Sequence, residues 1–446
     1  MLFNYDPSEE GFFSGINMKE KYNRIIAHSS VEAYRNDGDD EDRYYIPWRV
    51  AAEAAGRIKN GERVLTVLPR KDRFNEYLTL LSEVLLKGTP IPTLFTPDND
   101  YLMDVDIRHH LLPQLSGMVD RDTTVIPYQA TNEFYDWAQV LEQEKGIKIY
   151  ADRKREDLRF WWGHKGAYHR WMDDIETPSP YENIGISIPR GYIAQNYEEL
   201  EGARSLLGSG IVVKPIFGAG GFQIEKFGET ENLSGYDWPI DPHTKRNMPV
   251  AVQECLPISN DIFGERVYSH QFAGQQLQGR LTRQIMDFDT GRQWIGNRIP
   301  AGVSVDFERK ADRLCEMLID RINPLGDGGI DLAEVLGEPV LIEVNGGRPT
   351  GATGPKIFQA SFAPDAPHFI FTKVAPNGYS AHDAWDSLHR VTAPRSKRKI
   401  VFQERTRRGV FPMVWLNDSW GMLASFGDSY EEADSQLKQA RDKLGV

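Results

Sequence analysis

The chain has 446 residues, of which 40% are hydrophobic and 26% are charged, and its formal net charge is −13. This length is sufficient for two or three domains, each with its own hydrophobic core. The acidic balance disfavours nucleic acid as the main partner, because proteins that bind phosphate backbones usually present a basic surface. No apolar run approaches the roughly 18 residues of a membrane span, and the start "MLFNYDPSEEGFF" lacks the basic segment of a signal peptide.

The first 150 residues alternate short apolar runs with helical patterns, which predicts an open α/β domain. The runs "ERVLTVLP" (62–69), "TPIPTLF" (89–95) and "DTTVIPY" (122–128) are predicted to be strands. Among them, "NEYLTLLSEVLLKG" (75–88) has helical apolar spacing and ends at a glycine, as helices commonly do.

The middle of the chain mixes helices with longer strands. The stretch "WWGHKGAYHRWMDDI" (161–175) predicts a helix after Gly163, and "IPRGYIA" (188–194) predicts a strand. An asparagine cap, a helix and a glycine stop follow in "NYEELEGARSLLGSG" (196–210). Further on, "DFERKADRLCEMLIDRI" (306–322) has apolar residues at helical spacing.

The segment "IVVKPIFGAGGFQIEKF" (211–227) predicts a strand, a glycine-rich turn and a second strand. Its turn contains Gly218, Gly220 and Gly221, which allow positive φ and expose backbone N–H groups that can cradle phosphate. Lys214 lies in the first strand and can add a point charge. The spacing matches neither a Walker motif nor a dinucleotide-binding fingerprint. The alternative is a plain flexible hairpin with a lysine that reaches solvent.

The run "PVAVQECLP" (249–257) predicts a strand with Gln253 and Glu254 at its end. A strand that stops beside an adenine can offer backbone N–H and C=O groups to the base, and a carboxylate to its amino group. The alternative is a polar pair on an edge strand. The next residue, Cys255, is expected to be buried and chemically inert.

Two strand-like runs, "GGIDLAEV" (328–335) and "LIEVNGG" (341–347), are separated by a short turn and predict a hairpin. Such a hairpin would bring Asp331 near Glu343 and Asn345, because the last two share a face of their strand. Two carboxylates and an amide oxygen suit Mg²⁺, which keeps several waters and shares phosphate oxygens.

The buried position of Glu343 has a second interpretation. A buried carboxylate costs several kcal/mol unless it is paired or holds a metal. A structural salt bridge with Arg348 would satisfy it equally well. Both interpretations remain open on this stretch alone.

The end of the chain predicts a small βββα unit that starts near residue 396. A capping box at the start of its helix is predicted from Ser429 followed by Glu432. The predicted elements are the strands "KIVFQE" (399–404), "GVFPMVWL" (409–416) and "WGMLASFG" (420–427), and the helix "SYEEADSQLKQARDKLG" (429–445).

Over roughly residues 151–360, the order of these segments resembles the ATP-grasp ligases. The shared order is a strand lysine with a glycine-rich hairpin, a strand that ends in glutamate, an aspartate, and a Glu-x-Asn pair. The resemblance implies an α/β protein with the ATP-grasp fold and with ATP and Mg²⁺ as cofactors. The implied domains are an N-terminal open α/β pre-ATP-grasp domain (1–150), the ATP-grasp region (151–395, with a lid subdomain at about 166–256) and a small C-terminal βββα domain (396–446).

The resemblance implies a nucleotide site and a metal site. The residues that match the nucleotide site are the phosphate lysines Lys165 and Lys214, the flap from Gly218 to Phe222 with Gly220 and Gly221, and the adenine hinge of Glu254, Cys255 and Leu256. The residues that match the Mg²⁺ ligands are Asp331, Glu343 and Asn345.

Two arginines are implied to act on the reacting groups. Arg348 lies where related ligases place a basic group near the acyl phosphate. Many members of the family have an arginine two residues before the metal-binding aspartate, and Gly329 stands there in this chain. Arg283 is the candidate to replace it.

The resemblance implies an ATP-dependent carboxylate–amine ligase, which forms an acyl phosphate, releases ADP and phosphate, and makes an amide or peptide bond. The ending "EVNGGRPTG" (343–351) and the tail are similar to peptide ligases of the pheganomycin type. Two alternatives remain: an enzyme that loads an amino acid onto a carrier-protein thiol, and a nucleotide-binding protein without ligase activity.

We expect small-molecule carboxylates and amines or peptides as partners, and neither nucleic acid nor a membrane. A homodimer is left open. The two cysteines, Cys255 and Cys315, give no disulfide framework and favour a cytoplasmic protein.

Overall fold

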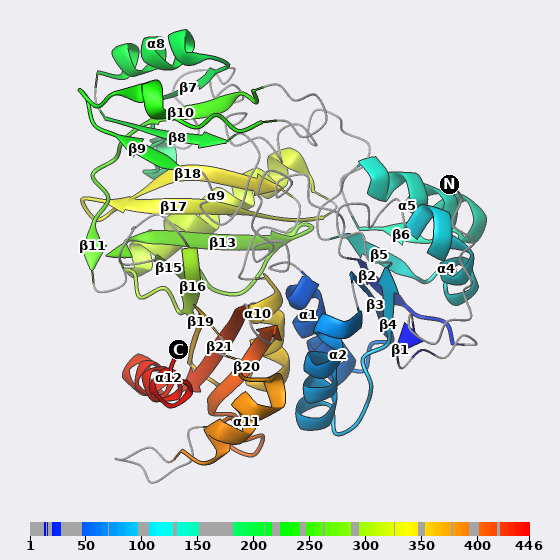
Figure 1. The fold of residues 1–446 in the computed structure, drawn as a ribbon. Coiled ribbons are helices and arrows are strands. Elements are labelled where there is room, and N and C mark those ends of the chain that lie inside the picture. Colours follow the sequence, from blue (N-terminus) through cyan, green and yellow to red (C-terminus); the bar gives the residue numbers. More distant parts are fainter. Residues whose placement is uncertain are drawn as a thin grey trace. The chain divides into compact units, whose positions relative to one another are not determined.

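The chain forms two compact units in the computed structural model (Figure 1). The first contains the described residues up to Tyr150 and those from Thr353 onward, and the second contains those from Glu182 to Gly346. No helix in the described part of the chain is long and apolar enough to cross a membrane. The described residues are 13–14, 16, 20–27, 47–69, 71–96, 107–127, 132–150, 182–208, 210–215, 224–240, 247–261, 264–286, 294–324, 326–346, 353–375, 378–391, 401–416 and 420–446.

The first unit contains a six-stranded sheet in the order β1-β4-β3-β2-β5-β6. Its strands pair in parallel except β1, which is antiparallel to β4. Parallel neighbours need crossover connections, and helices supply them along the chain. The strands are β1 (Phe13–Ser14), β2 (Arg24–Ala27), β3 (Val64–Pro69), β4 (Thr93–Thr96), β5 (Thr124–Pro127) and β6 (Lys148–Ile149). The helices are α1 (Pro47–Lys59), α2 (Lys71–Leu80), η3 (Leu81–Leu85), η5 (Ile107–Leu111), α4 (Leu112–Met118) and α5 (Asn132–Lys145).

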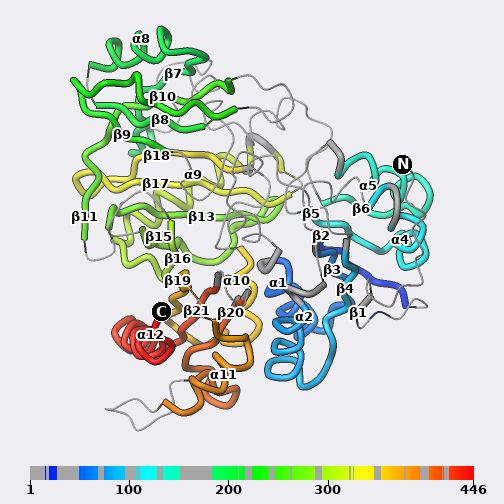
Figure 2. Tube along the Cα trace, in the orientation of Figure 1, coloured from blue at the N-terminus to red at the C-terminus, as the bar shows by residue number. Residues whose placement is uncertain are grey.

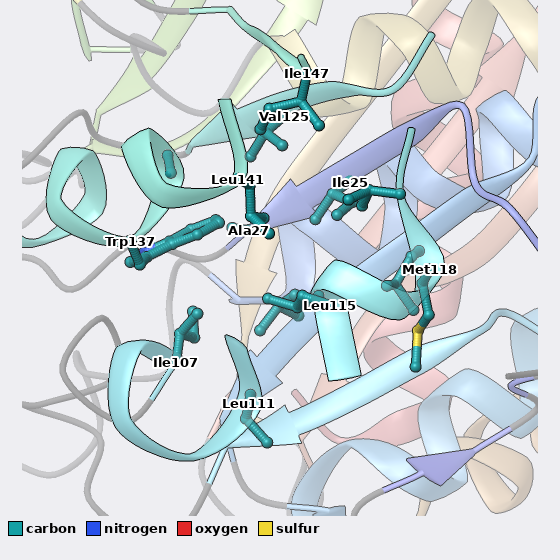
Figure 3. Close-up of a cluster of buried hydrophobic side chains, with 14 of the residues drawn as sticks. Ile25, Ala27, Ile107, Leu111, Leu115, Met118, Val125, Trp137, Leu141 and Ile147 are labelled. Atoms are coloured by element: carbon teal, nitrogen blue, oxygen red, sulfur yellow. The ribbon is translucent and has the colours of Figure 1, made fainter. Parts of the chain in front are cut away.

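A hydrophobic core lies between this sheet and helices η5, α4 and α5 (Figure 3). Ile25 and Val125 come from adjacent strands, and Trp137 of α5 is fully buried in the same cluster. Apolar side chains of the strands therefore pack against those of α5 in one core. This arrangement agrees with the open α/β domain predicted from the sequence.

A second sheet in the first unit contains the strands in the order β19-β21-β20, all antiparallel. The ring of Phe369 on β19 stacks on that of Phe426 on β21, with 4.7 Å between centroids. Helices α11 and α12 pack on these strands. The elements are α10 (Thr353–Phe362), β19 (His368–Val374), α11 (Ala381–His389), β20 (Gly409–Leu416), β21 (Trp420–Gly427) and α12 (Tyr430–Leu444).

Helix α1, from the start of the chain, packs against α10, as the blue and yellow tubes of Figure 2 show. Gly56 lies at their crossing, where an added Cβ would be 2.9 Å from Ser361 Oγ and 3.3 Å from the carbonyl oxygen of Ile357. The absence of a side chain at this position lets the two helices approach closely. The first unit is thus assembled from both ends of the chain.

The second unit contains two larger sheets. A four-stranded antiparallel sheet has the order β7-β10-β8-β9, and a longer antiparallel sheet runs β18-β17-β13-β15-β16, with β14 beside β13. Helix α9 (Val305–Ile322) covers one face of the longer sheet through Leu314, Cys315 and Leu318. The other elements are η6 (Glu182–Ile184), β7 (Gly191–Ala194), α8 (Tyr197–Leu207), β8 (Ile211–Pro215), β9 (Glu225–Phe227), η7 (Leu233–Gly235), β10 (Val250–Glu254), β11 (Asn260–Asp261), β12 (Gly264–Glu265), β13 (Val267–Ala273), β14 (Gln276–Leu277), β15 (Thr282–Met286), β16 (Trp294–Ile299), β17 (Asp327–Val335) and β18 (Glu338–Gly346).

Most elements predicted from the sequence are confirmed. Asn196 caps α8 and Gly208 ends it in the left-handed conformation, and the Ser429 side chain accepts the cap hydrogen bond of α12. The predicted strand at 399–404 is wrong over its described part, 401–404, where Val401 and Gln403 make only isolated bridges. The predicted helix at 161–175 lies outside the described residues. The division into three domains at residues 150 and 395 stays a prediction, and β19, which precedes residue 396, pairs fully with β21.

Candidate functional site

The hairpin of β17 and β18 brings three polar side chains together in the second unit. Asp331 pairs with Glu343 across the hairpin, and the next pair along this face joins Gly329 to Asn345. The Nδ2 of Asn345 donates a hydrogen bond of 3.1 Å to Oδ2 of Asp331. The meeting of these three residues, predicted from the hairpin pattern, is therefore confirmed.

A β-bulge decides which face Glu343 takes. From the turn onward the pairing is regular as far as Leu332 opposite Leu341, but Asp331 then lies opposite Glu343 and not Ile342. One extra residue on β18 reverses the alternation of its side chains. Glu343 and Asn345 therefore share the face of Asp331, while Leu341 stays in the core against α9.

Two further residues bind the Asp331 carboxylate, and the sequence analysis did not identify them. Ser269 Oγ, on β13, donates to Oδ1 at 2.5 Å, and Gln284 Nε2, on β15, donates to the same oxygen at 3.0 Å. Each carboxylate oxygen accepts about two hydrogen bonds. Oδ1 is therefore saturated, whereas Oδ2, which accepts only from Asn345 among these donors, keeps a site for another ligand.

Lys214 adds a positive charge from the four-stranded sheet. It lies in the middle of β8, its exposed fraction is 7%, and its charge acts on Asp331. Burial raises the pKa of Asp331 to about 7, and the nearby Glu343 pushes this pKa in the same direction. Hydrogen bonds from Ser269 and Asn345 and the charge of Lys214 oppose that rise.

The end of β10 lies against the same hairpin. Gln253 is buried, and its Nε2 is 3.5 Å from the carbonyl oxygen of Ile342, the bulged residue. The carboxylate of Glu254 accepts hydrogen bonds from the backbone N–H of Arg190 at 2.8 Å and from its Nε at 3.1 Å. Glu254 is thus held at the strand end by Arg190, which the sequence analysis did not foresee.

Cys255 is exposed, so the expectation that it is buried is wrong. The reason is that β10 ends at Glu254, and the chain then leaves the sheet while the Cys255 backbone N–H donates to the carbonyl oxygen of Gly210 at 2.7 Å. The following Leu256 is half-buried, and its carbonyl oxygen accepts from the N–H of Ile258. The buried cysteine is Cys315, on the side of α9 that faces the core.

Arg283 is not brought to this cluster. It lies next to Gln284 on β15, so its side chain points to the opposite face of the sheet. There its guanidinium is 2.9 Å from Asp261 Oδ1 and 3.4 Å from the hydroxyl of Tyr268, and only 2% of the side chain is exposed. In the described structure Arg283 anchors the β11–β12 segment to the sheet.

Several other residues named from the sequence lie outside the described part of the chain. They are Lys165, Gly218, Gly220, Gly221, Phe222 and Arg348. Their assignments rest on the sequence alone, and so does the alternative salt bridge between Glu343 and Arg348. The hairpin that carries the flap is described up to Pro215 and from Ile224, with β8 and β9 paired antiparallel.

A metal could be held here by oxygen ligands only. Within the described ranges, no group of three or more His, Cys, Asp or Glu side chains is arranged to hold an ion. Asp331 and Glu343 supply two carboxylates, and Asn345, whose Nδ2 faces Asp331, has its amide oxygen available to a ligand. Such a set leaves most coordination positions to water or to a ligand's own oxygens, as Mg²⁺ sites do.

Comparisons with known proteins reveal a shared fold. No protein-family model and no curated protein match the chain. Among solved structures, N5-carboxyaminoimidazole ribonucleotide synthetase with ADP matches with a TM-score of 0.57 and 12% identity, over 96% of this chain and 99% of that one. The biotin carboxylase domain of 2-oxoglutarate carboxylase from Hydrogenobacter thermophilus, solved with MgADP, ADP and bicarbonate, matches at 0.60 and 12%, over 95% and 90%. The Staphylococcus aureus N5-carboxyaminoimidazole synthetase with ADP matches at 0.54 and 10%, over 97% and 100%.

These likenesses extend over nearly the whole of each chain, while the identities stay near one residue in ten. They show that the protein is an α/β chain with the ATP-grasp fold. The fold prediction made from the sequence is thereby confirmed.

Proposed function

We propose that the protein is an ATP-dependent, ADP-forming ligase that activates a carboxylate and couples it to an amine. In the first step an oxygen of the carboxylate attacks the γ-phosphorus of ATP, and ADP leaves with the bridging oxygen. In the second step the amine nitrogen attacks the carbonyl carbon of the acyl phosphate, phosphate leaves, and the nitrogen loses a proton. The products are an amide, ADP and phosphate.

The observation that carries this proposal is the cluster of buried Lys214 and Asp331 with half-buried Glu343. One sheet supplies the cation and the other supplies the carboxylates. Phosphoryl transfer depends mainly on positioning and on neutralising charge, and needs little acid–base chemistry from the protein. A buried lysine opposite two carboxylates is suited to hold a triphosphate together with its metal ions.

The donor set fits Mg²⁺. Oδ2 of Asp331, the carboxylate of Glu343 and the amide oxygen of Asn345 would be its ligands, and all are hard oxygen donors. Bound Mg²⁺ would neutralise the triphosphate oxygens and increase the electrophilicity of the γ-phosphorus. Ser269 and Gln284 would hold the Asp331 carboxylate in one orientation. The matched structures solved with ADP or MgADP support ATP and Mg²⁺ as the ligands.

The remaining roles rest on the sequence resemblance. Lys214 and Lys165 would contact the phosphates, with Gly218 to Phe222 as the flap above them. The hinge residues Glu254, Cys255 and Leu256 would contact the adenine. Arg348 would neutralise the acyl phosphate. Arg283 fits this role poorly, because it faces Asp261 on the other side of the sheet.

The experiment is a screen for ADP release by the purified full-length chain with ATP and Mg²⁺. Amino acids, dipeptides and bicarbonate are tested as carboxylates, each with and without an added amine. Release of ADP that needs both partners, with an amide product of matching mass, supports the ligase. Stoichiometric AMP would contradict the acyl-phosphate route, and no ADP release with any pair while ATP still binds would favour a nucleotide-binding protein.

The finer proposal is that the acceptor is an amine and the product a peptide. This finer proposal rests on the similarity of "EVNGGRPTG" and of the C-terminal tail to peptide ligases of the pheganomycin type. Including a phosphopantetheine-bearing carrier protein in the screen separates it from thiol loading, because a thioester is cleaved by hydroxylamine at neutral pH and an amide is not. If the carboxylate and the carrier protein release ADP together while no amine does, the acceptor is a thiol.

A further inference from the structure

A pocket of about 480 Å³ lies in the first compact unit, and none of the proposed active-site residues lines it. Val84 and four larger apolar residues form its apolar walls. The larger four are Leu85, Phe362, Trp385 and Phe402, which come from η3, α10, α11 and the segment before β20. A volume of this size is within the usual range for small-molecule sites, roughly 300 to 1,000 Å³. The walls offer flat surfaces to a ring, since three of the four residues are aromatic.

The polar lining of this pocket is predominantly cationic. Lys59 and Glu404 both line the pocket and lie 3.3 Å apart. Lys87, which is not part of the lining, is 3.1 Å from the same carboxylate, so two ammonium groups share one negative charge. These lysines lower the pKa of Glu404 and keep it ionised. Lys59 also lies over the ring of Phe362, with its Nζ 5.9 Å from the centroid. The cation thus stands directly above an aromatic wall.

Two arginines complete the lining. Arg407 is 2.7 Å from Asp365, and Arg405 makes no hydrogen bond or ion pair with any described residue. The lining therefore has three cations, Lys59, Arg405 and Arg407, against the one carboxylate of Glu404, which is an excess of two positive charges. This excess is unexpected in a chain with a net charge of −13.

One of these cations has an unusual backbone conformation. Arg407 has a φ of 55°, in the left-handed region that glycine or asparagine usually occupies. It ends a tight turn in which its N–H donates to the carbonyl oxygen of Gln403 at 2.7 Å. A glycine would fit this turn without strain, so the backbone does not require the arginine side chain at this position.

We propose that this pocket binds a small molecule with a flat apolar body and an anionic group, either a carboxylate or a phosphate. The ring would lie between Phe402, Trp385 and Phe362, and the anion would meet Arg405, whose donors are uncommitted among the residues that the structure describes. Lys59 would stabilise the same charge above the ring. None of its residues belongs to the compact unit that carries the proposed ligase site.

The test measures binding to the full-length chain without ATP and Mg²⁺, which keeps it separate from the ligase proposal. Phenylacetate and phenyl phosphate serve as anionic probes and benzyl alcohol as the neutral probe of similar size, by saturation-transfer NMR and calorimetry. We expect at least one anion to bind about tenfold more tightly than benzyl alcohol. The tighter of the two anions identifies the recognised group.

Three variants examine the residues. Arg405→Ala should weaken the preferred anion about tenfold, and Arg407→Gly should weaken it without loss of thermal stability. Val84→Phe, which fills the pocket from its wall, should abolish binding of all three probes. Arg121→Ala removes an exposed arginine that does not line the pocket and should change nothing. Equal affinity for anions and benzyl alcohol, no binding at millimolar concentration, or unchanged binding in Arg405→Ala would overturn the proposal.

Discussion

Gln284 and Asp331 are joined by a hydrogen bond of 3.0 Å, although β13 lies between their two strands. The amide reaches over β13 where that strand carries Ser269, whose small side chain leaves room and binds the same carboxylate oxygen. Three adjacent strands therefore fix the orientation of one buried acid. The other carboxylate oxygen, Oδ2, accepts a hydrogen bond from Asn345.

Replacing Gln284 by leucine is expected to raise the Mg²⁺ concentration for half-maximal turnover by about tenfold or more. The carboxylate would lose one of the two donors on Oδ1 and could rotate. Titrating Mg²⁺ at saturating ATP measures this effect. Gln276→Leu, at an exposed position on β14, is the matched control. If the Gln284→Leu protein is less stable but needs the same Mg²⁺ concentration, the role of Gln284 is structural only.

Glu343→Gln is expected to lower turnover at least about 100-fold while the melting temperature stays the same or rises. The charge of Glu343 raises the pKa of Asp331, so removing it relieves repulsion in the absence of metal. Glu338→Gln, on the same strand and paired with Lys310, is the control and should keep full activity. A less stable but active Glu343→Gln protein would instead support the salt bridge with Arg348.

Lys214→Met should weaken ATP binding by roughly tenfold or more, because the phosphates would lose a buried charge-assisted contact. Calorimetry with a non-hydrolysable ATP analogue provides the measurement. Lys226→Met, on neighbouring β9 and paired with Glu265, removes an equal charge that does not face Asp331. If both variants bind the analogue as the parent does, Lys214 is not a phosphate ligand.

The pKa of about 7 for Asp331 predicts how stability depends on pH without Mg²⁺. A carboxyl whose pKa is raised on folding binds more protons in the folded than in the unfolded state, so its contribution to stability is lost as pH rises. The window extends from the ordinary value of 3.8 to about 7.

Asp331→Asn, which does not titrate, provides the reference. The parent should lose stability relative to this variant as the pH rises through that window, as measured by urea unfolding in the presence of a chelator. Saturating Mg²⁺ should reduce the loss, since the metal neutralises the ionised carboxylate. A stability difference that is constant from pH 4 to pH 8 would mean that the acid titrates normally.

Gly427→Ala should destabilise the protein by about 2 kcal/mol. The added Cβ would lie 2.8 Å from the backbone N of Ala433 and 2.9 Å from the carbonyl oxygen of Ser429, and neither atom can move without shifting the start of α12. Gly202→Ala, inside α8 with nothing within 4 Å, is the matched control and should stabilise. Thermal melts of both variants compare them directly.

The sequence predicts the part of the site that local pairing creates. Asp331, Glu343 and Asn345 belong to one hairpin, whose turn at Leu336 and Gly337 is short enough to set the register. Ser269 and Gln284 are 62 and 47 residues from Asp331, and a single sequence does not reveal which strands become neighbours. The sequence pattern that could have indicated Ser269 and Gln284 is the occurrence of polar residues at alternating positions of two apolar strands.

The errors have similar physical origins. Cys255 was expected to be buried at the end of its strand, but the strand had already ended at Glu254. The segment at 399–404 has a strand composition, but only Val401 and Gln403 find bridge partners there. Strand β19 completes the C-terminal sheet instead, through pairs such as His368 with Gly427, which composition cannot indicate.

The packing of α1 against α10 constrains when the first unit can finish folding during synthesis. Asn60, at the end of α1, hydrogen-bonds to Ser361, a residue 301 positions later. A ribosome must therefore translate most of the chain before the alanine-rich face around Gly56 has a partner to cover it. Until then that face is open to chaperones, proteases and other chains, and a protein truncated before α10 would leave it so permanently.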